Sequence, residues 1–282
     1  MHLWCEGNQT PTVVVLPCLG GAGIEWAGVQ RALQQETAVC LVDRAGLGWS
    51  DRSPWPRTMD RMADEVITAL DRSGLQPPFV MVGHSTGGLL ARLVAVRFRD
   101  KVAALVLVDS SHEDQNHRFP KSLADSLYWR AIRARFRPLG IRRVAVDLGL
   151  DRQHERVGSE IPVDPVDTYV ALYLTARDRR ASVQELIGFA RDNPHLRNEA
   201  RRLGDLPVTM ITAGPKRRES RWDKDGSTWL ELQDDLAGLS SRTTRVFAEH
   251  AGHHVHHDDP DLVARVIRDV VDQVRAGGVE PG

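Results

Sequence analysis

Short apolar runs alternate with longer segments of helical periodicity along most of the chain, and no other feature constrains the fold as strongly. Six runs have the length and apolar character of buried strands: Thr12 to Leu16, Ala38 to Val42, Phe79 to Val82, Ala103 to Val108, Val208 to Thr212 and Thr243 to Phe247. Five segments carry apolar residues at helical spacing: Glu25 to Gln35, Met59 to Arg72, Gly87 to Phe98, Thr228 to Leu239 and Pro260 to about Arg275. Strands and helices in alternation predict an α/β fold with a mostly parallel, doubly wound sheet covered by helices.

The alternation stops between about Ser111 and Leu206, where the chain becomes rich in arginine and helix-like. Tyr169, Leu172 and Tyr173 share one stripe of that segment. We therefore expect a helical cap inserted into one α/β domain. The expected organisation is a first core part at residues 1–110, a cap at 111–206 and a second core part at 207–282, a size that one domain with an insert can bury.

Charge and cysteine content narrow the class of partner and the compartment. The chain has 37 basic and 38 acidic residues, a formal net charge of -1, which gives no field toward nucleic acid or an anionic membrane. Met1 to Thr10 includes Glu6 and lacks a long apolar run, and no stretch approaches the ~20 apolar residues of a membrane span. We expect a cytoplasmic protein that binds neither nucleic acid nor membrane, with Cys5, Cys18 and Cys40 as reduced thiols.

A G-x-S-x-G pattern, Gly83 to Gly87, lies where a predicted strand passes directly into a predicted helix. Such a turn strains the backbone of its serine and needs glycines on both sides so that strand and helix can cross closely. It would expose Ser85 at a helix N-terminus, where the helix dipole and the Thr86 amide favour an oxyanion. The pattern predicts Ser85 as a nucleophile, although a Gly-Ser turn without chemistry has the same letters.

Four landmarks occur in a characteristic order: Leu19-Gly20-Gly21 after the first strand, Asp43 to Ser50 after the second, the turn from Val82 to Gly88, and Ala251-Gly252-His253 near the end. With them the chain resembles the α/β-hydrolase family over nearly its whole length. The resemblance implies the α/β-hydrolase fold with eight strands or slightly fewer, and no cofactor. Because only Met1 to Gly7 precedes the first core strand, we expect an early edge strand to be missing. A serine at position 85 argues against dehalogenase and epoxide hydrolase chemistry, which uses a carboxylate there.

His253 occupies the place of the family's catalytic histidine, and an imidazole that titrates near neutral pH can shuttle the serine proton. Four more histidines surround it: His250, His254, His256 and His257. With Asp258 and Asp259 they could be interpreted as a metal site, but so many histidines of one loop cannot all converge. We expect solvent-exposed histidines around one catalytic histidine, and no metal.

The catalytic acid is harder to place. After the penultimate strand, its usual position in the family, the chain carries the basic run Lys216 to Arg218. Asp109 follows the strand that ends at Val108, a position from which some family members supply the acid, and we favour it. A carboxylate at a strand end that only bonds loop amides is the alternative interpretation. Further candidates for the acid are Glu219, Asp223 and Asp225.

The family resemblance also implies an oxyanion hole made by the Leu19 and Thr86 amides. Cys18 stands where the family usually has glycine, and we expect a buried small side chain there rather than a second nucleophile. In the cap, several arginines form either a solvated helix face or a site for an anionic substrate or an acyl-carrier protein: Arg130, Arg133, Arg135, Arg137, Arg142 and Arg143. Four aromatic side chains line an acyl pocket or fill the cap core: Trp129, Tyr169, Tyr173 and Trp222.

Together these residues predict a serine hydrolase that cleaves a carboxylic ester, thioester or lactone of a small-molecule acyl substrate through an acyl-serine. The alternative is a non-hydrolytic enzyme on the same scaffold, such as a lyase, cyclase or acyltransferase. A binding protein without turnover is a third class, against which the presence of both Ser85 and His253 argues.

Overall fold

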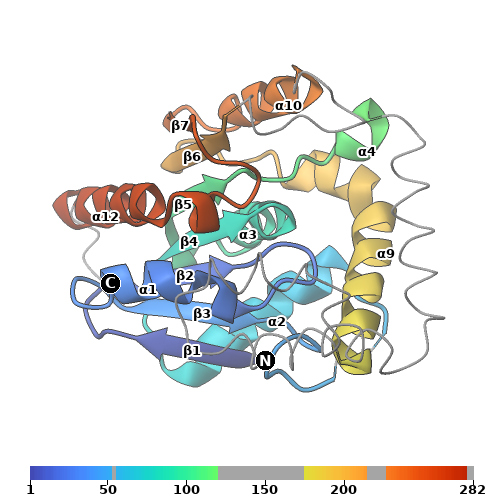
Figure 1. Ribbon diagram of the computed structural model, residues 1–282, viewed down its shortest axis with the longest axis horizontal. Helices are drawn as coiled ribbons and strands as arrows, with labels where there is room; N and C mark the ends of the chain where they lie inside the picture. Colours follow the sequence, from blue (N-terminus) through green and yellow to red (C-terminus); the bar gives the residue numbers. More distant parts are fainter. Residues whose placement is uncertain (53–54, 120–174, 215–226, 278–282) are drawn as a thin grey trace, which may run out of the picture.

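The computed structural model describes residues 1–52, 55–119, 175–214 and 227–277, and one twisted sheet runs through its centre (Figure 1). Its seven described strands lie in the order β1-β3-β2-β4-β5-β6-β7. They are β1 (His2–Glu6), β2 (Val13–Leu16), β3 (Val39–Asp43), β4 (Phe79–His84), β5 (Val102–Val108), β6 (Val208–Ala213) and β7 (Thr243–Ala248). All neighbouring pairs are parallel except β1 with β3. This arrangement confirms the predicted α/β fold, and it places the carboxyl ends of six parallel strands at one edge of the sheet.

Helices cover both faces of the sheet, as Figure 1 shows. The helical segments are η1 (Gly23–Trp26), α1 (Ala27–Leu33), α2 (Met59–Ser73), α3 (Thr86–Arg97), η2 (Arg99–Lys101), α4 (Gln115–Arg118), α9 (Ala176–Glu199), α10 (Ser227–Ala237), α11 (Val255–Asp258) and α12 (Pro260–Ala276). α1 and α12 pack together on one face, and α2 and α3 pack together on the other. β2, β3 and β4 are buried along their whole length, because each lies between these two helical layers.

Local signals explain where two of the longer helices begin and end. The Thr58 side chain accepts a hydrogen bond from the Arg61 amide at the start of α2, and Gly74 ends that helix in the left-handed conformation at φ 78°. Pro260 opens α12, where the Asp259 side chain accepts from the Leu262 amide at 3.0 Å. These caps hold the amphipathic helices in register on the sheet.

The first residues of the chain form the edge strand β1, which the sequence did not predict. The seven described strands agree with the expected eight strands or slightly fewer. Residues of β1 pair antiparallel with β3, and this register sets Cys5 directly opposite Cys40. The two cysteines form a disulfide with a Cα–Cα distance of 4.0 Å. The expectation of reduced thiols is therefore wrong for this pair and holds only for Cys18. Because disulfides are rare in the cytosol, the cysteines lend no support to the cytoplasmic prediction.

Much of the predicted cap lies outside the described residues, including its stripe of Tyr169, Leu172 and Tyr173. The described part contains α9, which packs against α2 and α3 and buries Phe189 and Leu196 in the core. Its Gly188 lies so close to the chain before α2 that an added Cβ would be 1.7 Å from the Arg57 carbonyl oxygen. α9 therefore sits directly on the core. No helix within the described ranges combines the length and the hydrophobicity needed to cross a membrane.

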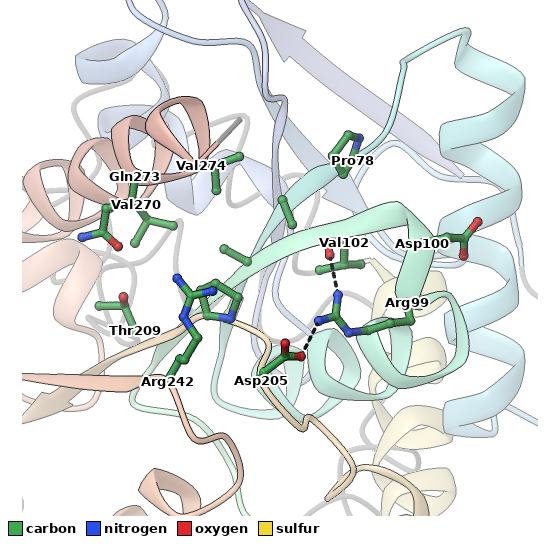
Figure 2. A pocket seen from close by; sticks show the side chains of 14 residues that line it. Pro78, Arg99, Asp100, Val102, Asp205, Thr209, Arg242, Val270, Gln273 and Val274 are labelled. Atoms are coloured by element: carbon green, nitrogen blue, oxygen red, sulfur yellow. Dashed lines mark hydrogen bonds and ion pairs between the residues drawn. The ribbon is translucent and has the colours of Figure 1, made fainter. Parts of the chain in front are cut away.

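A hollow of about 380 Å³ lies at the amino ends of β5, β6 and β7, next to the end of α12 (Figure 2). Arg99 bonds Asp205 at 3.2 Å on its wall, and the Arg242, Val270 and Gln273 side chains also line it. Ligands of open α/β sheets bind at the opposite, carboxyl ends of the strands. The edge at the carboxyl ends of the strands is therefore the expected place of a functional site.

Candidate active site

Ser85 lies at the turn between β4 and α3 with a backbone conformation that L-residues rarely adopt, φ 54° and ψ -123°. Its amide donates to the Val108 carbonyl at 3.2 Å, and its carbonyl accepts from the amides of Gly88 at 2.9 Å and Ser111 at 2.8 Å. The neighbouring chain thereby holds the strained conformation in place. The Ser85 hydroxyl lies 3.4 Å from that of Ser111.

Three glycines around Ser85 leave no room for a side chain. A Cβ on Gly83 would be 2.4 Å from the Gly87 carbonyl oxygen, and one on Gly87 would be 2.0 Å from the Leu16 carbonyl oxygen. A Cβ on Gly88 would be 2.3 Å from the Ser110 hydroxyl. The glycines of the motif thus permit the close crossing of β4, α3 and the end of β2.

Asp109 comes directly after β5, is fully buried and has a positive φ of 43°. Its Oδ2 lies 2.7 Å from Nδ1 of His253, in the loop that follows β7. A carboxylate only accepts hydrogen bonds, so Nδ1 of His253 carries the proton and Nε2 keeps its lone pair in the neutral ring. This is the arrangement that prepares an imidazole to act as a base.

The other oxygen of Asp109 accepts from the Ala213 amide at 3.1 Å and from Nε1 of Trp229 at 3.3 Å. The sequence left open whether Asp109 pairs with the histidine or only bonds loop amides. In the structure its carboxylate accepts hydrogen bonds from both His253 and the Ala213 amide. Trp229 also meets the His253 ring edge to face, with centroids 5.8 Å apart. Sequence reasoning missed Trp229, since its place in a predicted helix carries no signal for a contact with a residue 120 positions earlier.

His84, which directly precedes Ser85, connects the turn to the His253 loop. Its Nε2 donates to the His253 carbonyl at 2.8 Å, and the two rings lie 4.8 Å apart. His84 is fully buried, and this burial holds its pKa well below the ordinary value. A neutral His84 therefore anchors the backbone of His253 beside the serine turn.

His256 is buried and stacks on Trp26 with ring centroids 4.3 Å apart. The expectation that all flanking histidines face solvent was wrong for this residue, because the first turn of α11 directs it into the core between β4 and η1. His250 and His254 are exposed as expected. The sequence shows five histidines in one loop but not the aromatic ring beneath one of them.

Two groups of described side chains could hold a metal ion. One consists of His84, His254 and His256, the other of Glu25, His256 and His257, and the ligand atoms of each group lie within 4.8 Å of one another. His84 already uses one ring nitrogen on a carbonyl oxygen. The absence of a metal from the chemistry stays a prediction.

Residues 17–21 follow β2, and we call them the oxyanion loop after the role that the sequence predicts for the Leu19 amide. The Thr86 amide opens α3 and so has no acceptor within its own helix. Leu19 lies in the oxyanion loop, whose start touches the first turn of α3 at Gly87. Cys18 as a whole residue is partly exposed, so it is less buried than expected. Desolvation of its thiol, followed by the charge of Glu25, raises the thiol pKa, so this sulfur stays protonated and is a poor nucleophile.

Several predicted residues lie outside the described residues. They are the alternative acids Glu219, Asp223 and Asp225, the cap arginines from Arg130 to Arg143, and the aromatic residues Trp129, Tyr169, Tyr173 and Trp222.

The model of the family described as alpha/beta hydrolase fold matches residues 11–260. The chain belongs to this family. The alpha/beta hydrolase core accounts for the sheet order and for the turn at Ser85. Among curated proteins, the chain is similar to the (lyso)-N-acylphosphatidylethanolamine lipase of Bos taurus, with 25% identity over 95% of this chain and 80% of the relative.

Solved structures of this fold align over nearly the whole chain. A thermophilic esterase from Thermogutta terrifontis is 21% identical with a TM-score of 0.69, covering 97% of this chain and 93% of that one. The enol-lactonase from Burkholderia xenovorans LB400 is 20% identical with a TM-score of 0.70, covering 96% of each chain. At this identity the likeness establishes the fold.

Two other curated relatives are longer proteins, an uncharacterized protein of Schizosaccharomyces pombe and a probable transporter of Hormonema carpetanum. The chain spans 43% and 40% of their respective lengths.

Proposed function

We propose that the protein is a serine hydrolase that cleaves a carboxylic ester, thioester or lactone of a small-molecule acyl compound. The observation that carries the proposal is the 2.7 Å bond between Asp109 and His253, next to a serine held in the strained turn. Relatives of the family that are named lipase, esterase and lactonase support the same reaction class.

In the proposed mechanism, Nε2 of His253 takes the proton of the Ser85 hydroxyl while Oγ attacks the acyl carbon. Asp109 keeps the imidazole in the right tautomer and stabilises the imidazolium that forms. The imidazolium then gives its proton to the departing oxygen or sulfur as the acyl bond breaks. Water, deprotonated in turn by His253, attacks the acyl-serine and returns Ser85 to its starting form.

The Leu19 and Thr86 amides are proposed to bind the oxyanion of both tetrahedral intermediates. Backbone donors need no particular side chain, so Cys18 in place of the family's usual glycine is compatible with this role. The helix dipole of α3 adds partial positive charge at the same place.

Intact-mass spectrometry after treatment with a fluorophosphonate tests the proposal. The wild type should gain one adduct, Ser85→Ala and His253→Ala should gain none, and the wild type should turn over at least one member of a p-nitrophenyl ester chain-length series. A wild type that gains no adduct would exclude an activated serine and favour the lyase, cyclase or binding alternatives. Adduct formation without turnover of any ester would favour an acyltransferase or a different acyl group.

A further inference from the structure

Two buried charged side chains from distant parts of the sequence hold the oxyanion loop. Arg44 follows β3, and Glu185 lies in the third turn of α9; each residue is about 2% exposed. The residues are 141 positions apart and form a bidentate ion pair, in which Nε of Arg44 donates to Oε1 of Glu185 at 2.7 Å and Nη2 donates to Oε2 at 2.8 Å. They meet behind the loop that we propose to bind the oxyanion.

Two further N–H groups of the Arg44 guanidinium donate to carbonyls of the oxyanion loop. Nη1 donates to the Pro17 carbonyl at 2.7 Å, and Nη2 donates to the Cys18 carbonyl at 2.6 Å. The Cys18 carbonyl also accepts from the Gly21 amide at 2.9 Å. Hydrogen bonds from a charged group are roughly twice as strong as neutral ones. Two successive peptide groups are therefore fixed by one rigid fork.

The orientation of the Leu19 amide follows from the planarity of the peptide bond. In a trans peptide, the C=O of one residue and the N–H of the next point in opposite directions. Because the Cys18 carbonyl points at Arg44, the Leu19 N–H points away from it. A peptide whose carbonyl is polarised by a guanidinium is also a stronger donor at its N–H.

Glu185 supports the other half of the loop. Its Oε2 accepts from the Gly20 amide at 3.2 Å, and Gly20 has a φ of 67°. A Cβ on Gly20 would lie 2.5 Å from the Ser182 hydroxyl, one turn earlier in α9. The loop is thus enclosed between Arg44 on the core and Glu185 on α9. Arg44 fixes the peptide that precedes Leu19, and Glu185 fixes the peptide that follows it.

We propose that Arg44 and Glu185 are positioning residues that set the direction of the Leu19 amide toward the oxyanion. The inference rests on the proposed function, since it assigns a role within the same site. Neither side chain touches the reacting atoms. Their contribution should therefore appear where the oxyanion forms, in kcat and in the rate of phosphonylation, and not in ground-state binding measured by KM.

The variant Arg44→Lys tests this directly, because lysine keeps the charge and loses the planar fork. We expect kcat on a p-nitrophenyl ester and the second-order rate of fluorophosphonate labelling to fall about 100-fold, the usual loss of one oxyanion donor. KM should change less than about threefold, as expected when a group acts only in the transition state. Glu185→Gln keeps the shape of the side chain and an acceptor for the Gly20 amide, so kcat and the labelling rate should fall less, about tenfold.

The matched control is Arg57→Lys. Arg57 is likewise fully buried, but it pairs with Glu65 of α2 at 2.5 Å and its backbone lies against α9 at Gly188. It should lower thermal stability while kcat stays within about twofold. Hydrogen–deuterium exchange of the amides of residues 18–21 should accelerate in Arg44→Lys and stay unchanged in Arg57→Lys.

An Arg44→Lys protein that is folded by circular dichroism and keeps kcat within threefold of the wild type overturns the proposal. So does an equal loss of kcat in Arg57→Lys. A failure of the proposed function is seen separately, as a wild type that forms no adduct before any variant is compared. In that case unchanged exchange at residues 18–21 in Arg44→Lys still overturns the support of the loop, and accelerated exchange still upholds it.

Discussion

The His253 side of the candidate site and the oxyanion loop are held in different ways. Asp109 follows β5 directly and His253 lies in the loop after β7. The pairing of these strands with β6 in the sheet therefore sets where both residues lie. The oxyanion loop follows β2, but its peptides are fixed by Arg44 and Glu185, the latter from α9, a helix within the predicted insert. The Asp109–His253 pair is therefore positioned by strand order, whereas the oxyanion loop is positioned by an ion pair between residues distant in the sequence. The first should tolerate changes in the cap that the second does not.

The largest expected effect is on the His253 side. Asp109→Asn keeps the size of the side chain but replaces the carboxylate that accepts from Nδ1, and an amide nitrogen there would favour the wrong tautomer of the imidazole. We expect kcat on a reactive ester to fall on the order of 10³- to 10⁴-fold, as for other triads, with residues 18–21 unchanged in deuterium exchange. Steady-state kinetics measures the first and exchange measures the second.

Asp223→Asn is the matching control for the acid, because Asp223 is a candidate in the sequence. It should keep kcat within about threefold of the wild type. If Asp223→Asn lost the activity and Asp109→Asn kept it, the acid would come from the loop after β6 and the assignment of Asp109 would fail.

A second effect belongs to the oxyanion side and depends on pH. Asp178, one turn before Ser182 in α9, is buried, and burial together with Glu185 and Glu25 raises its pKa to about 8. Between about pH 4 and pH 8 the folded protein holds a proton that the unfolded chain has lost, so stability falls as pH rises through this window. Asp178→Asn removes the part of this pH dependence that comes from Asp178.

Relative to the wild type, the Asp178→Asn variant should gain stability from pH 5 to pH 8, by a few kcal/mol at most. Urea unfolding at several pH values measures the difference. A difference between variant and wild type that stays constant with pH would show that Asp178 is ionised throughout, and that α9 carries one more negative charge beside Glu185.

The smallest expected effect comes from Trp229→Phe. Phenylalanine keeps the aromatic contact with His253 and loses the 3.3 Å bond to Asp109. Asp109 keeps its bonds to His253 and to the Ala213 amide, so loss of the Trp229 bond should lower kcat about threefold to tenfold, equivalent to about 1 kcal/mol. A change in KM without a change in kcat would instead place Trp229 in substrate binding.

Sequence reasoning reached the parts of the molecule that local pattern encodes. The apolar runs predicted the parallel strands to within one or two residues at most ends, and the glycines around Ser85 predicted the turn because the crossing leaves no space for a Cβ. Asp109 was favoured from its place after a strand, and it does meet His253. Its catalytic role remains a proposal.

Contacts between residues that are distant in the sequence could not be predicted from local patterns. β1 was missed because a five-residue run with mixed exposure has no clear alternation, and its disulfide was missed with it, since only the register sets Cys5 opposite Cys40. His256 looked like one of several exposed histidines until the structure placed Trp26 beneath it. The Arg44–Glu185 pair has no signal at all, because nothing in either segment specifies a partner 141 residues away.

The position of Glu185 matters to anyone who transplants a different cap onto this core. A graft that exchanges the whole of residues 111–206 removes the glutamate together with the rest of the predicted cap, and it leaves the buried guanidinium of Arg44 without its carboxylate partner. Such an orphaned charge costs about 3–5 kcal/mol. A chimera joined before α9 keeps the pair intact. The practical border of the exchangeable module therefore lies at the start of that helix and not at Leu206, where the chain returns to the sheet.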